Sequence, residues 1–261
     1  MIKPHSNAWY DWLAEEGGRY EYPWNSSLSP FNGEDLYSSL VRSHLAQDKT
    51  VLDVGCGHGE DALLYAQHAK SVTAYDRAEG FIETAKANAI AQGIENVEFI
   101  HGDSSARAND GVPRIPTDKT FDLLVTRRGP THWLADARRV AKAGAVLIGL
   151  HPAETQPPVW VEDLPGELES PFSTDGSIKN RIEARLAESD LYFESTWHVQ
   201  VPEYLNDVRA LYDFLSFGLG KEIPNYDEVE TELETLFNAH AREGKLSIPH
   251  ARFLWLARVN D

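Results

Sequence analysis

The sequence is poor in cysteine and in positive charge, and it has no long apolar run. Its 261 residues include one cysteine, Cys56, so no disulfide can form within the chain and a zinc–thiolate cluster is excluded. No apolar run approaches the roughly 18 residues of a membrane span, and residues 1–16 lack the apolar core of a signal peptide. These absences predict a soluble, cytoplasmic protein without a metal site, and they leave its oligomeric state open.

The scarcity of positive charge bears on the partners of the protein. The chain has 24 lysines and arginines against 41 aspartates and glutamates, which gives a net charge of −17. A field of this sign repels phosphate backbones, so nucleic acid is a disfavoured partner. The charge is compatible with small neutral or cationic substrates, although it also serves solubility alone.

The middle of the chain shows an alternation of strands and helices. The predicted strands are Thr50–Val54, Ser71–Tyr75, Val97–Ile100, Phe121–Val125 and Ala145–Leu150, and the predicted helices between them are Glu60–Ala69, Glu79–Gln92 and Leu134–Ala141. Such alternation is typical of an α/β fold, with a mostly parallel sheet covered by helices on both faces. Apolar residues make up 42% of the chain, which is enough for a full core.

The two ends of the chain differ from this middle part. Residues 1–49 are rich in aromatic side chains and are predicted to form a helical N-terminal cap on a domain spanning residues 50–261. That domain carries two predicted insertions, at 152–190 and 202–250. The remaining predicted elements are the helices Ile178–Glu188, Leu205–Leu219 and Tyr226–Ala241 and the strands Tyr192–Val201 and Ala251–Val259.

A glycine-rich turn follows the first predicted strand of the middle part. The sequence DVGCGHGED places Gly55, Gly57 and Gly59 between that strand and the next helix. A dinucleotide-binding G-x-G-x-x-G pattern would need a glycine at position 60, where this chain has Glu60 followed by Asp61. Two carboxylates at a helix start repel a pyrophosphate, so the turn is predicted to hold a ligand without phosphates. This argues against a nicotinamide-dependent oxidoreductase.

Charged side chains also follow the strands at the same edge of the predicted sheet. Asp53, Asp76, Asp103 and Arg127 all fall at carboxyl ends of strands, where open α/β sheets bind their ligands. One extended ligand with a cationic part, a ribose and a base, but no phosphate, would meet all four. S-adenosylmethionine fits this description.

The stretches VLDVGCGHGEDALLYA, VTAYD, ANAIAQGIENVEFIHGD and FDLLVTRRGPTHWL resemble the class I S-adenosylmethionine-dependent methyltransferases over roughly residues 45–150. The resemblance implies a Rossmann-like, doubly wound sheet of seven strands, mostly parallel with an antiparallel last strand. It also implies that the cofactor is S-adenosyl-L-methionine. The cofactor-binding residues that it implies are Asp53, Gly55, Cys56, Gly57, Gly59, Asp76, Asp103 and Ser104. We predict that Arg77 and Thr126 also contact the cofactor.

The segment TRRGPTHW, after the fourth strand of the middle part, supplies the candidate catalytic residues. Arg127 and Arg128 either pair with the abundant acids or orient an anionic substrate group by bidentate contact. We predict catalytic roles for Arg128 and His132, with His151 as a second candidate for a general base. The segment lacks the [DNS]-P-P-[YFW] motif that amino-methylating enzymes of this superfamily use on nucleic-acid bases.

Aromatic residues supply the candidate substrate site. Trp9, Tyr10, Trp24 and Trp133, together with Arg127, are predicted to contact the substrate, and the aromatic rings either pack in the core or line a pocket over the sulfonium. The predicted function is transfer of a methyl group from S-adenosylmethionine to a small molecule. An RNA or protein methyltransferase and a non-catalytic S-adenosylmethionine-binding module remain as alternatives.

Overall fold

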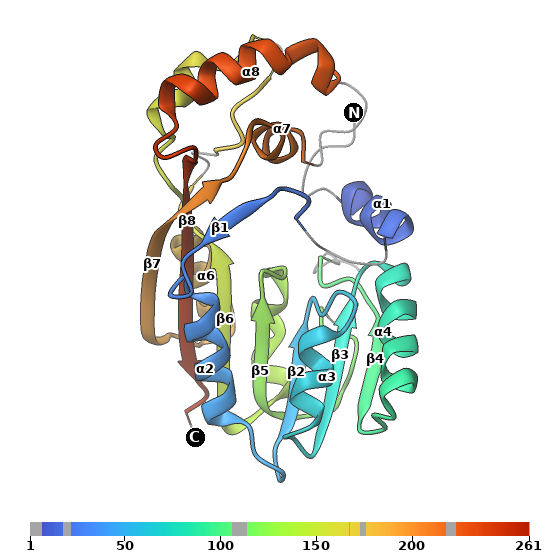
Figure 1. The fold of residues 1–261 in the computed structure, drawn as a ribbon. Helices are drawn as coiled ribbons and strands as arrows, with labels where there is room; N and C mark the ends of the chain where they lie inside the picture. The colour runs from blue at the N-terminus through green and yellow to red at the C-terminus, as the bar shows by residue number, and fades with distance from the viewer. Residues whose placement is uncertain are drawn as a thin grey trace.

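The protein is built around one eight-stranded sheet (Figure 1). The computed structural model describes residues 7–17, 22–105, 114–166, 168–172, 176–217 and 223–260. The strand order is β1-β7-β8-β6-β5-β2-β3-β4. Five neighbouring strands pair in parallel: β2 (Thr50–Val54), β3 (Ser71–Asp76), β4 (Val97–His101), β5 (Phe121–Arg127) and β6 (Ala141–Pro152). We call the side of the sheet where these five strands end the carboxyl edge, and the opposite side the amino edge.

Three strands complete the sheet in antiparallel pairings. Strand β8 (Leu246–Arg258) pairs antiparallel with both β6 and β7 (Phe193–Leu205). The predicted fold class, mostly parallel with an antiparallel last strand, is therefore confirmed. An eighth strand, β1 (Ser26–Leu28), pairs with the end of β7. The N-terminal segment thus adds a strand to the sheet instead of forming only a helical cap, and the proposed boundary at residue 49 stays a prediction.

Helices cover both faces of the parallel strands. One face is packed by α2 (Glu34–His44), α3 (Glu60–Ala66) and α4 (Glu79–Gln92), and the other by the 3-10 helix η2 (His132–Asp136), α5 (Ala137–Val140) and α6 (Ile178–Glu188). Strand β2 is therefore buried on both faces: Val51 faces one apolar core, and Leu52 and Val54 face the other. A strand buried on both faces reads as a continuous apolar run, which is why it was predictable.

A separate apolar cluster forms above the carboxyl edge. It joins α7 (Val208–Ser216) and α8 (Tyr226–His240) to the 3-10 helix η3 (Val159–Asp163), around buried side chains that include Trp160 and Leu233. Figure 1 shows α7 and α8 over the ends of β7 and β8. Helix α1 (Asn7–Gly17) packs on α4 through Trp9 and Phe81. None of the helices in the described part of the chain is long and apolar enough to cross a membrane.

Strands β7 and β8 continue beyond the rest of the sheet. The pairing of β6 with β8 stops at Pro152 and Arg252, whereas β7 and β8 stay paired to Leu205 and Leu246. This extension carries β1 on its free side and forms a wall that rises from the carboxyl edge. The predicted strand 192–201 was too short, because the pairing with β8 holds four further residues in extended conformation.

Candidate functional site

The glycine-rich turn after β2 is folded tightly against its neighbours. The backbone N–H groups of Gly55 and Cys56 both donate to the carbonyl of Tyr75, at 2.9 and 3.1 Å. Gly55, Gly57 and Gly59 have φ of 72°, 52° and 86°, a region that L side chains rarely adopt. The turn therefore needs glycine at three positions for reasons of backbone conformation alone.

The three glycines differ in how much room a side chain would have, and this difference shows where a ligand can lie. A Cβ at Gly55 would lie 2.9 Å from Cδ of Pro130, and one at Gly59 would lie 2.8 Å from Cβ of Ala85. A Cβ at Gly57 would meet nothing within 4 Å. The first and third glycines are thus required for packing, whereas the backbone at Gly57 borders open space that a ligand can use.

Asp76 lies beside that space, at the end of β3. Its carboxylate accepts hydrogen bonds from the backbone N–H groups of Gly57 and Ala78, both at 2.9 Å. Burial raises the pKa of Asp76, and the two backbone hydrogen bonds partly oppose the shift. Each carboxylate oxygen keeps a further lone pair, so the group is fixed in place and can still accept from ligand hydroxyls.

Asp53, in β2, is a buried carboxylate without a positive partner of its own. It is 3% exposed, and no described residue donates a hydrogen bond to it. Burial raises its pKa well above the ordinary value, and the nearby carboxylates of Asp61 and Asp76 raise it further, while Arg127 opposes them. Such a group is stabilised by a positive charge brought in by a ligand.

The other predicted cofactor residues are held in different ways. Oγ1 of Thr126, which is fully buried, donates to the carbonyl of Val54 at 2.9 Å and so braces β5 against β2. Arg77 makes a two-pronged contact with Asp11 of α1, at 2.8 and 3.3 Å. Burial raises the pKa of the Cys56 thiol well above its usual range, which leaves it unreactive.

The predicted adenine side of the site is only partly described. Oδ1 of Asp103 accepts from the backbone N–H of Ser105 at 2.7 Å, and Ser104 is buried. Residues 106–113 lie outside the described residues. The contact of Asp103 and Ser104 with a base therefore stays a prediction.

The structure shows one of the two roles left open for Arg127. Its guanidinium Nε lies 2.7 Å from Asp61, and its terminal nitrogens lie 3.8 and 3.9 Å from Glu60 and Glu34. Arg127 thus pairs with acids of this chain, and a role in holding an anionic substrate group stays a prediction without structural support. Arg128 has φ of 61°, and its guanidinium lies 5.8 Å from the ring centroid of Tyr22.

The two histidines predicted as general bases differ in position. His151 is 3% exposed, and burial together with Arg181 lowers its pKa to about 3. Its ring stacks on Trp255, so it is a neutral core residue, and its prediction as a base is corrected. His132 lies on η2, which packs against α6; burial and Arg185 lower its pKa, and its catalytic role stays a prediction.

The predicted substrate-binding aromatics divide between core and site. Trp133 is fully buried in the core beneath β5 and β6, which corrects its assignment to a pocket wall. Trp9 is also fully buried, with Tyr10 and Phe217 packed on its ring. Burial, together with Tyr22 and Asp76, raises the pKa of Tyr10 to about 12, and its contact with the substrate stays a prediction.

Trp24 is the predicted aromatic that reaches the wall formed by β7 and β8. Its ring stacks on Tyr22, with centroids 4.5 Å apart, and its Nε1 donates to Glu203 at 2.9 Å. Glu203 and its neighbour His250 were not predicted from the sequence. They are 47 residues apart, and only the register of β7 on β8 brings them together.

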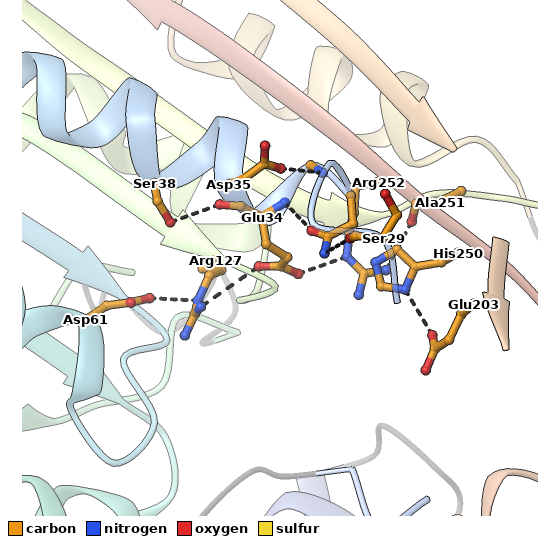
Figure 2. A network of polar contacts seen from close by, with 12 residues as sticks. Ser29, Glu34, Asp35, Ser38, Asp61, Arg127, Glu203, His250, Ala251 and Arg252 are labelled. Atoms are coloured by element: carbon orange, nitrogen blue, oxygen red, sulfur yellow. Dashed lines mark hydrogen bonds and ion pairs between the residues drawn. The ribbon is translucent and has the colours of Figure 1, made fainter. Parts of the chain in front are cut away.

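A row of charged side chains extends from the glycine-rich turn to that pair (Figure 2). Arg127 contacts Asp61 and Glu34, as described above, and Oε1 of Glu34 accepts from Nε of Arg252 at 3.0 Å. Nδ1 of His250 lies 3.1 Å from Oε2 of Glu203. Glu34 and Arg252 are 218 residues apart, so no local motif signals their contact.

Comparison with known proteins gives this fold and site a family. Residues 51–147 match the family model described as a methyltransferase domain. A functionally unknown protein of Deinococcus radiodurans R1 is 23% identical, with a TM-score of 0.67 over 96% of this chain and 98% of that one. A methyltransferase of Thiobacillus denitrificans in complex with S-adenosyl-L-homocysteine is 17% identical, with a TM-score of 0.51 over 95% and 97% of the two chains.

Curated relatives match a smaller region. YcgJ of Bacillus subtilis, an uncharacterised methyltransferase, is 28% identical over 44% of this chain and 43% of that protein. An uncharacterised RNA methyltransferase of Clostridium acetobutylicum is 40% identical over 34% of this chain and 18% of that protein. The chain thus spans less than half the length of these relatives. Family model, motif and fold agree on a methyltransferase domain that includes residues 51–147 and is similar to the class I S-adenosylmethionine-dependent methyltransferases.

Proposed function

We propose that this protein binds S-adenosylmethionine across the ends of β2, β3 and β4 and transfers its methyl group to a small-molecule acceptor. The observation that carries the proposal is the pairing of Asp76 with Gly57. The carboxylate is held by the backbone of the turn at 2.9 Å, and the space beside Gly57 is open. Ribose hydroxyls are donors that suit such a carboxylate.

The remaining residues of the turn support the same ligand. Asp53 is a buried carboxyl group near the glycines, and the positive part of a ligand lying there would stabilise its ionised form. Glu60 and Asp61 disfavour a pyrophosphate at the start of α3, because that helix end is already occupied by carboxylates. When bound, S-adenosylmethionine supplies an electrophilic methyl group, and the protein has to align the acceptor and exclude water.

The small-molecule acceptor is the finer part of the proposal. The net charge of −17 and the elements α1, α7 and α8 above the carboxyl edge favour a small ligand over a nucleic acid. Several relatives are named as RNA methyltransferases, but their matches cover 16–19% of those proteins. These matches support the shared methyltransferase domain and give little information on the acceptor.

The proposal is tested by calorimetric titration with S-adenosylmethionine. We expect binding by the wild-type protein, and a Kd at least about 100-fold higher in Asp76→Ala, because the carboxylate supplies charged hydrogen bonds of about 1.5–3 kcal/mol each. Glu79→Ala is the matched control. It removes the same charge from an exposed position three residues away and is expected to bind as the wild type does.

Folding has to be checked separately, because Asp76 also holds the turn. Thermal unfolding of each variant shows whether the chain is folded at the titration temperature, and Asp76→Asn keeps one oxygen for the backbone. Unchanged binding in a folded Asp76→Ala protein contradicts the placement of the ribose. Release of S-adenosylhomocysteine with transfer RNA, and none with small molecules, contradicts the small-molecule acceptor.

A further inference from the structure

Glu203 and His250 form a buried pair on the wall of β7 and β8. Glu203 is 8% exposed and accepts hydrogen bonds from Nε1 of Trp24 and Oγ of Ser26, at 2.9 and 2.7 Å, as well as from His250. Burial alone would raise the pKa of Glu203, but these hydrogen bonds outweigh it and lower the pKa to about 2. Glu203 is therefore ionised at neutral pH.

The ionised carboxylate determines which nitrogen of His250 carries the proton. An ionised carboxylate only accepts hydrogen bonds, so Nδ1 of His250, 3.1 Å away, must be the donor. In the neutral ring, Nε2 then carries the free lone pair. The pair thus presents a nitrogen base that is fixed in tautomer and orientation by the carboxylate behind it.

Nε2 of His250 is buried and has no hydrogen-bond partner among the described residues. Oε2 of Glu34 is also buried without a hydrogen bond, but the guanidinium of Arg127 lies 3.9 Å from it. A buried polar group without a partner costs about 1–3 kcal/mol. In the neutral ring Nε2 of His250 is a hydrogen-bond acceptor, so the group that completes it has to be a donor, such as a hydroxyl or an amine.

The position of the pair connects it to the cofactor side. His250 and Arg252 are two residues apart on β8, so their side chains point to the same face of the sheet. Arg252 belongs to the last residue pair between β8 and β6, and His250 lies just beyond that pair. Arg252 contacts Glu34, and Glu34 faces Arg127 at the end of β5. Figure 2 shows this row leading from the glycine-rich turn to His250.

We propose that His250, positioned by Glu203, takes the proton from the acceptor, and that the acceptor is methylated on a hydroxyl oxygen or an amine nitrogen. This inference rests on the proposed function. The acceptor's oxygen or nitrogen forms a bond to the methyl carbon as the carbon–sulfur bond breaks, with that electron pair going to sulfur. The proton of the acceptor goes to Nε2, and Glu203 stabilises the imidazolium that results.

The arginines of the row do not favour an anionic acceptor. Arg127 is paired with Asp61 and Arg252 with Glu34, so each cation already has a carboxylate of the chain. Glu203 on β7 contacts His250, while Arg252 lies two residues along β8 and pairs with Glu34 on α2.

The first experiment needs no acceptor. In nitrogen-15 NMR spectra of the histidine-labelled wild-type protein, recorded over a pH series, we expect the neutral form of His250 to carry its proton on Nδ1 and none on Nε2. In Glu203→Gln, the side-chain oxygen still accepts from Trp24 and Ser26, while the amide NH₂ faces His250 and forces the opposite tautomer. A neutral wild-type ring that is protonated on Nε2 overturns the proposal.

The second experiment identifies the methylated atom. The protein is incubated with S-adenosylmethionine labelled with carbon-13 in its methyl group and with the small-molecule fraction of a bacterial lysate. The carbon-13 shift of the product distinguishes methyl groups on oxygen, nitrogen, carbon and sulfur. We expect the label on a hydroxyl oxygen or an amine nitrogen, and a label on carbon, on sulfur or on a carboxylate overturns the inference.

Variants then separate the role of the base from that of the fold. His250→Gln is expected to lower product formation by about 100-fold or more, as loss of a general base does, while the Kd for S-adenosylmethionine stays within twofold. The rise of the rate with pH in the wild type is expected to be lost in Glu203→Gln. His198→Gln is the control, because His198 is an exposed histidine on β7.

The outcomes of these tests differ from a failure of the proposed function. If the wild-type protein does not bind S-adenosylmethionine in the calorimeter, the proposed function is wrong, whatever His250 does. If it binds the cofactor and forms product at an unchanged rate in His250→Gln, the methyltransferase assignment stands and the proposal for His250 is overturned.

Discussion

Carboxylates at the two edges of the parallel sheet have pKa shifts in opposite directions. At the amino edge, Asp122 accepts from the backbone N–H and the hydroxyl of Thr50 and from Nζ of Lys142, each at 2.8 Å. Burial raises its pKa, but these contacts outweigh burial and lower the pKa to about 2. At the carboxyl edge, burial raises the pKa of Asp53 and of Asp76.

The directions of these pKa shifts show which edge contributes to the stability of the folded chain. A carboxylate with lowered pKa stabilises the folded chain at neutral pH, whereas one with raised pKa destabilises it. The amino edge therefore contributes to stability, and the carboxyl edge holds negative charge that the fold does not neutralise. Buried groups with perturbed pKa values are typical of functional sites, and here they surround the glycine-rich turn.

The largest effect is expected from a change that fills the packed side of the turn. Gly59→Ala adds a Cβ 2.8 Å from that of Ala85, at φ of 86°, and should cost about 3 kcal/mol from the clash and the backbone strain together. Gly57→Ala meets nothing within 4 Å and should cost about 1 kcal/mol from strain alone. Urea unfolding measures both, and equal losses would contradict the contrast between the two glycines.

An intermediate effect is expected at the amino edge. Asp122→Asn should lower the free energy of unfolding by about 1–2 kcal/mol at pH 7, less than the full pKa shift implies, because solvent screens part of the interaction. The stability from Asp122 is present above its unfolded pKa of 3.8 and is lost as the pH falls towards 2. Urea unfolding between pH 2 and pH 7 should therefore show a smaller acid-induced loss in the variant than in the wild type.

The smallest effect on stability, with the opposite sign, is expected at the carboxyl edge. Asp53 has a raised pKa in the folded chain, so its contribution to stability falls as the pH rises above 3.8. Asp53→Asn removes this penalty and should raise the free energy of unfolding at pH 7, while it weakens the binding of S-adenosylmethionine. A variant that is destabilised at pH 7 as Asp122→Asn is would remove the contrast between the two edges.

The sequence predicts the parallel part of the fold because each of its elements carries a local signal. The bounds predicted for β2, α4 and α6 agree with the structure, and β3, β4 and β5 differ by one or two residues at one end. Apolar runs, a helix-ending glycine at position 93 and acids at helix starts were sufficient for these elements.

Elements that depend on distant contacts were missed or misplaced. Strand β1 has the sequence Ser-Ser-Leu, which carries no strand pattern and is extended only because it pairs with the end of β7. Helix α2 lies within the predicted helical cap, but its bounds were not predicted, and its first residue, Glu34, contacts Arg252 near the other end of the chain. For the same reason, the pair of Glu203 and His250 cannot be read from spacing, since it depends on the register of two long strands.

Short strand β1 also has a consequence for the order of assembly. It ties Trp24 to Glu203 across 179 residues, and Arg252 reaches Glu34 across 218. Contacts between such distant segments form slowly, because a long loop has to close before they are made. During synthesis the glycine-rich turn and the parallel strands around it emerge before residues 246–258, so the β7–β8 wall is the last part of the sheet that can be completed.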